Sequence, residues 1–83
     1  MKVLITGIAG FVGSHFTEFF LSKGNIDVSG IERWKASTEN IVHLKDKIRL
    51  YDECDINDIV SMRDILKKVK PDYAEHRYVI TPI

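Results

Sequence analysis

The sequence predicts an α/β fold in which short parallel strands alternate with helices. Two observations lead to this prediction. A short apolar run at residues 1–5 leads directly into a glycine-rich turn, after which apolar residues recur at helical spacing. Further short apolar runs then alternate with a second helical pattern along the chain. The 83 residues suffice for one small domain, and no Pro/Gly/Ser-rich linker divides them.

The turn after the first strand is Thr6–Gly13, with the spacing G-x-x-G-x-x-G. Gly7 permits a tight exit from the strand, Gly10 lets a phosphate approach the backbone, and Gly13 lets the following helix pack closely. A helix N-terminus offers free N–H groups and partial positive charge to a phosphate. Three glycines alone would equally fit a flexible loop, but their place between a strand and a helix favours dinucleotide binding.

The first helix is expected at residues 11–23 and ends at Gly24, a residue type that readily adopts the left-handed conformation. The second strand follows at residues 26–31. Its small residues Ser29 and Gly30 would let another backbone or a ligand come close.

Glu32 follows the second strand, about 20 residues after the last glycine of the turn. A carboxylate there can accept hydrogen bonds from the adenosine ribose and repels a 2′-phosphate, which favours NAD. Arg33, Trp34 and Lys35 come next and favour NADP, because a guanidinium can bind a 2′-phosphate. An ordinary polar strand end remains an alternative. Both cofactors stay open, with a slight preference for NAD.

The third strand is expected at residues 48–51, followed by Asp55 and Ile56 at the carboxyl edge of the sheet, where open α/β sheets bind ligands. Asp55 could accept a hydrogen bond from an adenine amino group, and Ile56 could contact the ring. Asp55 could instead cap the next helix, but Asn57 or Asp58 is the more natural cap.

Two further helices are expected. Residues 33–47 are polar and predict a short helix that begins near residue 37 or 38. Its aliphatic anchors are Ile41, Val42 and Leu44. The second helix spans residues 58–69 and ends before Pro71. Its apolar stripe consists of Ile59, Met62, Ile65, Leu66 and Val69.

Composition argues against several classes of partner. Twelve basic and twelve acidic residues are mixed along the chain, so no basic block indicates nucleic acid or a membrane surface. The apolar runs are too short to cross a bilayer, and the N-terminus does not resemble a signal peptide. Cys54 is the only cysteine, which rules out an internal disulfide and favours a cytoplasmic location. His15 is expected to be solvated, and no metal site is expected.

Together these motifs resemble the NAD(P)-dependent nucleotide-sugar epimerase/dehydratase family of extended short-chain dehydrogenases. The matching segments are T-G-x-x-G-x-x-G at 6–13, Glu32, Asp55-Ile56 and Lys70-Pro71-Asp72-Tyr73. Residues 30–34 and 38–41 resemble the branch of GDP-mannose 4,6-dehydratase and GDP-4-keto-6-deoxymannose reductase in particular.

The resemblance implies a bound NAD or NADP. The implied contacts are Gly7, Gly10, Phe11, Val12 and Gly13 around the pyrophosphate, Glu32 and Arg33 at the ribose, and Asp55 and Ile56 at the adenine. We expect a half-Rossmann fold over residues 1–83, with parallel strand order 3-2-1-4 and helices on both faces. This would be the N-terminal, cofactor-binding part of a larger domain.

The C-terminal segment departs from the family pattern. His76 could match a family histidine, but the Leu-Ala-Ala that follows it there is absent, and Glu75 fits a central strand poorly. If residues 74–83 form strand four, its edge would be open and could mediate self-association. The family's catalytic Tyr-x-x-x-Lys does not occur in the 83 residues.

We therefore expect no catalytic residue on this chain and no turnover by it alone, with a nucleotide sugar bound only if a substrate domain is supplied. Two other functions remain open. One is a non-catalytic NAD(P)-binding or sensing module, and the other is an inactive truncated gene product.

Overall fold

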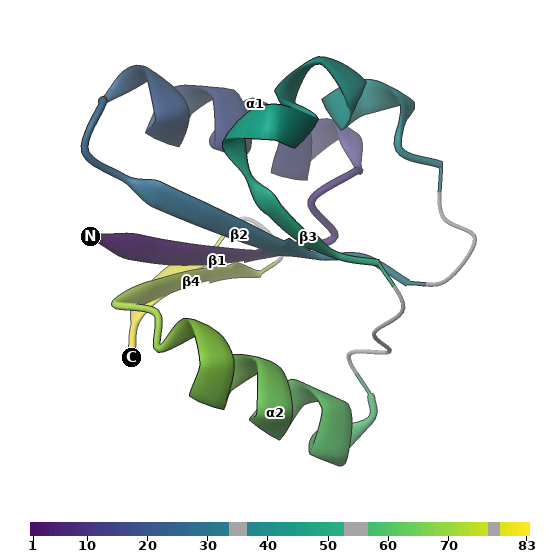
Figure 1. The fold of residues 1–83 in the computed structure, drawn as a ribbon, viewed down its shortest axis with the longest axis vertical. Coiled ribbons are helices and arrows are strands. Elements are labelled where there is room, and N and C mark those ends of the chain that lie inside the picture. Colours follow the sequence, from purple (N-terminus) through teal and green to yellow (C-terminus); the bar gives the residue numbers. More distant parts are fainter. Residues whose placement is uncertain (34–36, 53–56, 77–78) are drawn as a thin grey trace.

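A computed structural model of the chain describes residues 1–33, 37–52, 57–76 and 79–83. Strands and helices alternate through most of it, as the sequence predicts (Figure 1). The elements are β1 (Lys2–Thr6), α1 (Phe11–Ser22), β2 (Asp27–Ile31), the 3₁₀ helix η1 (Glu39–Lys47), β3 (Arg49–Tyr51), α2 (Ile59–Val69), β4 (Tyr73–His76) and β5 (Val79–Pro82).

The sheet has the order β3-β2-β1-β4-β5. The strands β1 to β4 pair in parallel, which confirms the predicted order 3-2-1-4. β5 was not predicted, and it pairs antiparallel with β4, with Glu75 opposite Ile80. Only residues 77 and 78 lie between these strands, which is too few for a parallel crossover. The prediction that strand four forms the open edge is therefore wrong, because β5 covers it.

Helices cover both faces of the sheet, as predicted (Figure 1). α1 and η1 lie on one face and α2 lies on the other. Side chains of β1 alternate between the two layers, since successive strand residues point to opposite faces. Val3 and Ile5 join the core with Ile8, Val28 and Ile41, and Leu4 joins Ile31, Ile65 and Val69 on the α2 side. The three central residues of β1 are all apolar because both faces of the strand are covered there.

The helix boundaries follow from local chemistry. α1 gives way to Lys23 and then to Gly24, whose φ of 88° confirms the predicted left-handed stop. Asp58 caps α2 by accepting hydrogen bonds from the N–H groups of Val60 and Ser61, at 3.1 and 3.4 Å. Lys70 then ends α2 in the left-handed conformation, directly before Pro71. The predicted ends of both helices therefore agree with the structure to within about one residue.

Some predicted anchors are exposed. Ile41 and Leu44 are buried, as predicted for the short helix, but Val42 is 62% exposed. Ile59 is 71% exposed at the start of α2. The sheet covers only part of the apolar stripe that was predicted for this helix. Glu75 was expected to fit a central strand poorly because it is charged, but it lies within β4 and is only 2% exposed.

Candidate functional site

The glycine-rich turn connects β1 to α1 at the carboxyl edge of the sheet. Gly7 has a φ of 60°, a conformation that residues with a Cβ rarely adopt, which explains the glycine there. The N–H of Gly10 donates to the carbonyl oxygen of Gly7 at 3.0 Å, and the N–H of Ser14 donates to that of Gly10 at 2.9 Å. The chain thus turns tightly and begins α1 at once.

The N-terminus of α1 lacks a side-chain cap among the residues that the structure describes. Gly10 occupies the N-cap position and has no side chain that could accept from the first turn. Helix geometry leaves the N–H groups of the first turn without intrahelical partners, and here these belong to Phe11, Val12 and Gly13. These donors and the positive end of the helix dipole form a site suited to an anion such as a phosphate.

Gly13 sets how closely α1 approaches the turn. A Cβ atom at this position would lie 2.4 Å from the carbonyl oxygen of Gly7 and 2.8 Å from Cα of Ile8. The helix therefore rests on the backbone that leaves β1, in line with the close packing predicted for Gly13. Gly30 makes room in the same layer, because a Cβ there would lie 2.2 Å from Cδ1 of Ile8. The sequence predicted that a backbone or a ligand would lie close to Gly30, but the close neighbour is the side chain of Ile8.

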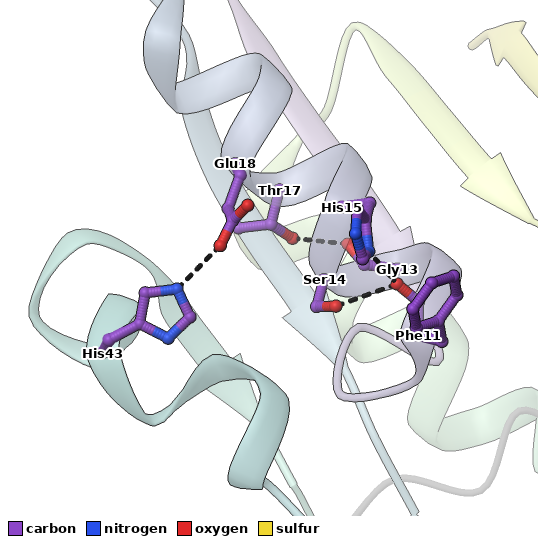
Figure 2. Close-up of polar contacts among 7 residues, drawn as sticks. All are labelled: Phe11, Gly13, Ser14, His15, Thr17, Glu18 and His43. Atoms are coloured by element: carbon purple, nitrogen blue, oxygen red, sulfur yellow. Dashed lines mark hydrogen bonds and ion pairs between the residues drawn. The ribbon is translucent and has the colours of Figure 1, made fainter.

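Polar side chains along α1 bond mainly to their own helix (Figure 2). The hydroxyl of Thr17 is fully buried and donates to the carbonyl oxygen of Gly13 at 2.8 Å, and that of Ser14 donates to Phe11 at 2.9 Å. These bonds satisfy the hydroxyls on the helix face that packs against the sheet. His15 is exposed, as predicted, and its Nδ1 lies 2.7 Å from the carbonyl oxygen of Phe11.

Glu32 lies against the turn. Its Oε2 accepts a hydrogen bond from the N–H of Ala9 at 3.0 Å, and its Oε1 accepts one from the N–H of Arg33 at 3.0 Å. The backbone of Glu32 is also held, because its N–H donates to the carbonyl oxygen of Tyr51 in β3. The carboxylate is therefore fixed at the end of β2, and each of its oxygens can still accept another hydrogen bond.

Among the remaining predicted contacts at the ribose and the adenine, the structure describes only Arg33. Arg33 is exposed next to Glu32 at the same strand end. Asp55 and Ile56, predicted at the adenine, lie outside the described residues, as do Trp34 and Lys35. Their roles remain predictions.

Asn40 is a site residue that the sequence did not reveal. Its Nδ2 donates to the carbonyl oxygen of Ala9 at 3.0 Å, across 31 positions of the chain. Asn40 lies in η1, and no motif in that polar segment signals a contact with the glycine-rich turn.

His76 meets the end of β1. Its Nδ1 lies 2.5 Å from the hydroxyl oxygen of Thr6, which is also 3.3 Å from the carbonyl oxygen of Glu75. This contact ties the carboxyl ends of β1 and β4 together, directly beside Gly7. The imidazole thus lies at the same edge of the sheet as the turn.

Two other kinds of site were sought in the part of the chain that the structure describes. No three His, Cys, Asp or Glu side chains there gather as ligands for a metal ion. No described helix is both long and apolar enough to cross a membrane.

The chain is similar to known nucleotide-sugar enzymes. Residues 4–76 match the family model described as GDP-mannose 4,6 dehydratase. The GDP-mannose 4,6-dehydratase of Vibrio cholerae is 35% identical over 79 residues, which cover 86% of this chain and 21% of that enzyme. The chain thus spans about a fifth of the length of this curated relative.

Solved structures agree with this similarity. The UDP-glucose 4-epimerase of Thermotoga maritima is 31% identical with a TM-score of 0.74, covering 89% of this chain and 23% of the epimerase. The UDP-glucuronic acid 4-epimerase of Bacillus cereus, solved with UDP-glucuronic acid and NAD, is 28% identical with a TM-score of 0.70, covering 93% and 26%. With its parallel strand order, its glycine-rich turn and the match over residues 4–76, the chain belongs to the GDP-mannose 4,6-dehydratase family, within the extended short-chain dehydrogenases, and represents an N-terminal portion of such enzymes.

Proposed function

We propose that this chain is the dinucleotide-binding portion of an NAD(P)-dependent nucleotide-sugar dehydratase, epimerase or reductase. The observation that carries the proposal is the start of α1. It follows a left-handed glycine and lacks a capping side chain among the described residues. The NAD in the related epimerase of Bacillus cereus supports the same kind of ligand here.

Each part of the turn has a distinct role in this proposal. Phe11, Val12 and Gly13 donate backbone hydrogen bonds to the pyrophosphate, and Gly10 leaves room for it. Glu32 accepts hydrogen bonds from the adenosine ribose through the lone pairs that its two backbone contacts leave free. Asp55 and Ile56 contact the adenine. Bound nicotinamide would accept or return a hydride at C4, while the residues named here would hold the adenosine and pyrophosphate parts of the cofactor.

We further propose that NAD is preferred to NADP. The carboxylate of Glu32 is fixed by two backbone N–H groups, so it cannot easily turn away from a 2′-phosphate. Arg33 is exposed and opposes this preference, because its guanidinium is free to approach the same phosphate. Repulsion between two charges about 4 Å apart in water is about 1 kcal/mol, which corresponds to about fivefold tighter binding of NADH than of NADPH.

The sugar substrate is expected to be GDP-mannose or a close relative, by similarity to the dehydratase of Vibrio cholerae. In the intact enzyme a hydride would pass between this sugar and the nicotinamide. The 83 residues hold no Tyr-x-x-x-Lys for the proton transfer, so the chain alone should not consume GDP-mannose. Measurable consumption by the purified chain would contradict this.

Fluorescence titration with NADH and with NADPH tests the proposal. The chain should bind NADH, and Gly10→Ala should weaken the binding by about tenfold or more, because the new methyl group would stand where the phosphates approach. The φ of Gly10 is −72°, which alanine adopts readily, and the new Cβ would lie 3.2 Å from the carbonyl oxygen of Gly7, so only a small shift of the turn is needed and this variant should remain folded. Val42→Ala, at an exposed position of η1, is the control and should bind normally. Negligible binding of both nucleotides would contradict the proposed function.

Glu32→Gln tests the cofactor preference separately. The amide keeps the size of the side chain and removes its charge, but its nitrogen cannot accept one of the two backbone hydrogen bonds. That loss affects both nucleotides alike, whereas removal of the charge should raise the ratio of NADPH to NADH affinity by about fivefold. A clear preference of the wild-type chain for NADPH would instead assign the ribose site to Arg33.

A further inference from the structure

Ala9 occupies the centre of the glycine-rich turn, between Gly7 and Gly10. It is buried in the same cluster as Ile8 and Ile41. Both of its backbone polar groups are bonded to side chains from outside the turn. The N–H donates to Glu32 Oε2 at 3.0 Å, and the carbonyl oxygen accepts from Asn40 Nδ2 at 3.0 Å.

The two side chains that hold Ala9 come from different elements. Glu32 follows β2, where its own N–H is bonded to β3. Asn40 belongs to η1, which is anchored beside α1 by the buried side chains of Ile41 and Leu44. Because Asn40 immediately precedes Ile41, the burial of Ile41 fixes the backbone from which the amide reaches Ala9. The turn is therefore held from two sides by parts of the fold that are themselves fixed.

We infer that Asn40 is a positioning residue for pyrophosphate binding, a step that rests on the proposed function. The Asn40 amide fixes the carbonyl of Ala9, and the peptide that joins Ala9 to Gly10 contains that carbonyl. Gly10 is the N-cap of α1, so the orientation of this peptide determines where the N–H groups of Phe11 and Val12 point. Donors that are already oriented bind an anion without the cost of ordering the turn.

The inference separates two parts of the ligand. Asn40 should affect the binding of the pyrophosphate, which contacts the start of α1, and should leave the binding of adenosine nearly unchanged. A residue that only stabilised the fold would affect both ligands alike. ADP-ribose and adenosine, which differ by the pyrophosphate and the second ribose, are suitable probes.

NMR titration of the ¹⁵N-labelled chain with each probe gives the test. Asn40→Leu keeps a similar size and removes the donor, so the dissociation constant for ADP-ribose should rise by about fivefold, as expected for one neutral hydrogen bond. The constant for adenosine should change by less than about twofold. Asn40→Asp has no hydrogen to donate and faces the carbonyl with a negative charge, so it should weaken ADP-ribose binding at least as much.

Glu39→Gln, at the neighbouring exposed position, is the control and should bind ADP-ribose like the wild type. Unchanged ADP-ribose affinity in both Asn40 variants would overturn the inference and leave the proposed function intact. Equal losses for ADP-ribose and adenosine would assign Asn40 a purely structural role and also overturn it. A wild-type chain that binds neither probe would contradict the proposed function itself, and with it the inference.

Discussion

The two halves of this fold differ in how completely their apolar surface is covered. The β1–α1–β2 half encloses Val3, Ile5, Ile8 and Val28, each 1% exposed or less. Met1, Phe11 and Phe19 are exposed in this half, but the α2–β4–β5 half carries more large apolar side chains that are exposed. These are Ile59, Val60, Leu66, Val79, Ile80 and Ile83. The glycine-rich turn belongs to the well-packed half, and His76 of the other half contacts Thr6 beside it.

The difference also concerns hydrogen bonds. The glycine-rich turn is held by Glu32 and Asn40, whose bonds to Ala9 cross between elements. At the other end of the sheet, β5 pairs with β4 on one side only and forms an edge. A strand with an open edge and exposed apolar residues is suited to association with another chain. The glycine-rich turn and this open edge therefore lie in separate parts of the molecule.

The largest effect is expected at Gly13. Gly13→Ala places a Cβ 2.4 Å from the carbonyl oxygen of Gly7, so α1 must move away from the turn. Overpacking of this kind should lower the free energy of unfolding by about 3 kcal/mol and abolish NADH binding. Urea denaturation measures the first effect. Gly24→Ala, at a φ of 88° with open space around it, is the matched variant and should lose only about 1 kcal/mol. Equal losses would show that Gly13 is not required by packing.

A smaller effect is expected from truncating isoleucine side chains in the two halves. Ile8 is fully buried, so Ile8→Ala should lower the free energy of unfolding by about 2–4 kcal/mol. Ile59 is 71% exposed, so Ile59→Ala should change it by less than about 0.5 kcal/mol. Similar losses for the two variants in urea denaturation would mean that Ile59 is covered in solution, and the comparison between the halves would fail.

The smallest effect is expected at the N-cap of α2. The hydroxyl of Ser61 and the N–H groups of Ser61 and Val60 bond to Asp58 and hold its pKa below the ordinary value of 3.8. The charged carboxylate is favoured in the folded state, so its contribution is present above pH 3.8 and is lost as the pH falls through the lowered pKa. The difference in stability between the wild type and Asp58→Ala should therefore shrink below pH 3.8. A difference that stayed constant down to full protonation would contradict the cap.

Local sequence patterns predicted the first half of the fold well. β1, the turn, α1 and β2 could be predicted because apolar spacing, glycine positions and the stop at Gly24 all lie close together in the sequence. The placement of Glu32 beside the turn also followed from its distance after the glycines. These are short-range signals, and each reflects a backbone or packing requirement of a single βαβ unit.

Other features depended on long-range contacts. β5 pairs antiparallel with β4, and no residue type in the C-terminal segment indicates this pairing. The bond from Asn40 to Ala9 joins positions 31 apart. Val42 and Ile59 were expected to be buried because they are apolar, but burial requires a covering element, and in this fold neither is covered.

The central claim is that the N–H groups at the start of α1 hold a pyrophosphate. An ¹⁵N NMR titration of the chain with NADH tests it most directly, because each of these groups gives its own signal. The account predicts that the signals of Phe11, Val12 and Gly13 shift most, while those of α2 stay in place. Saturable NADH binding that moved α2 or β5 and left these three signals unchanged would contradict it.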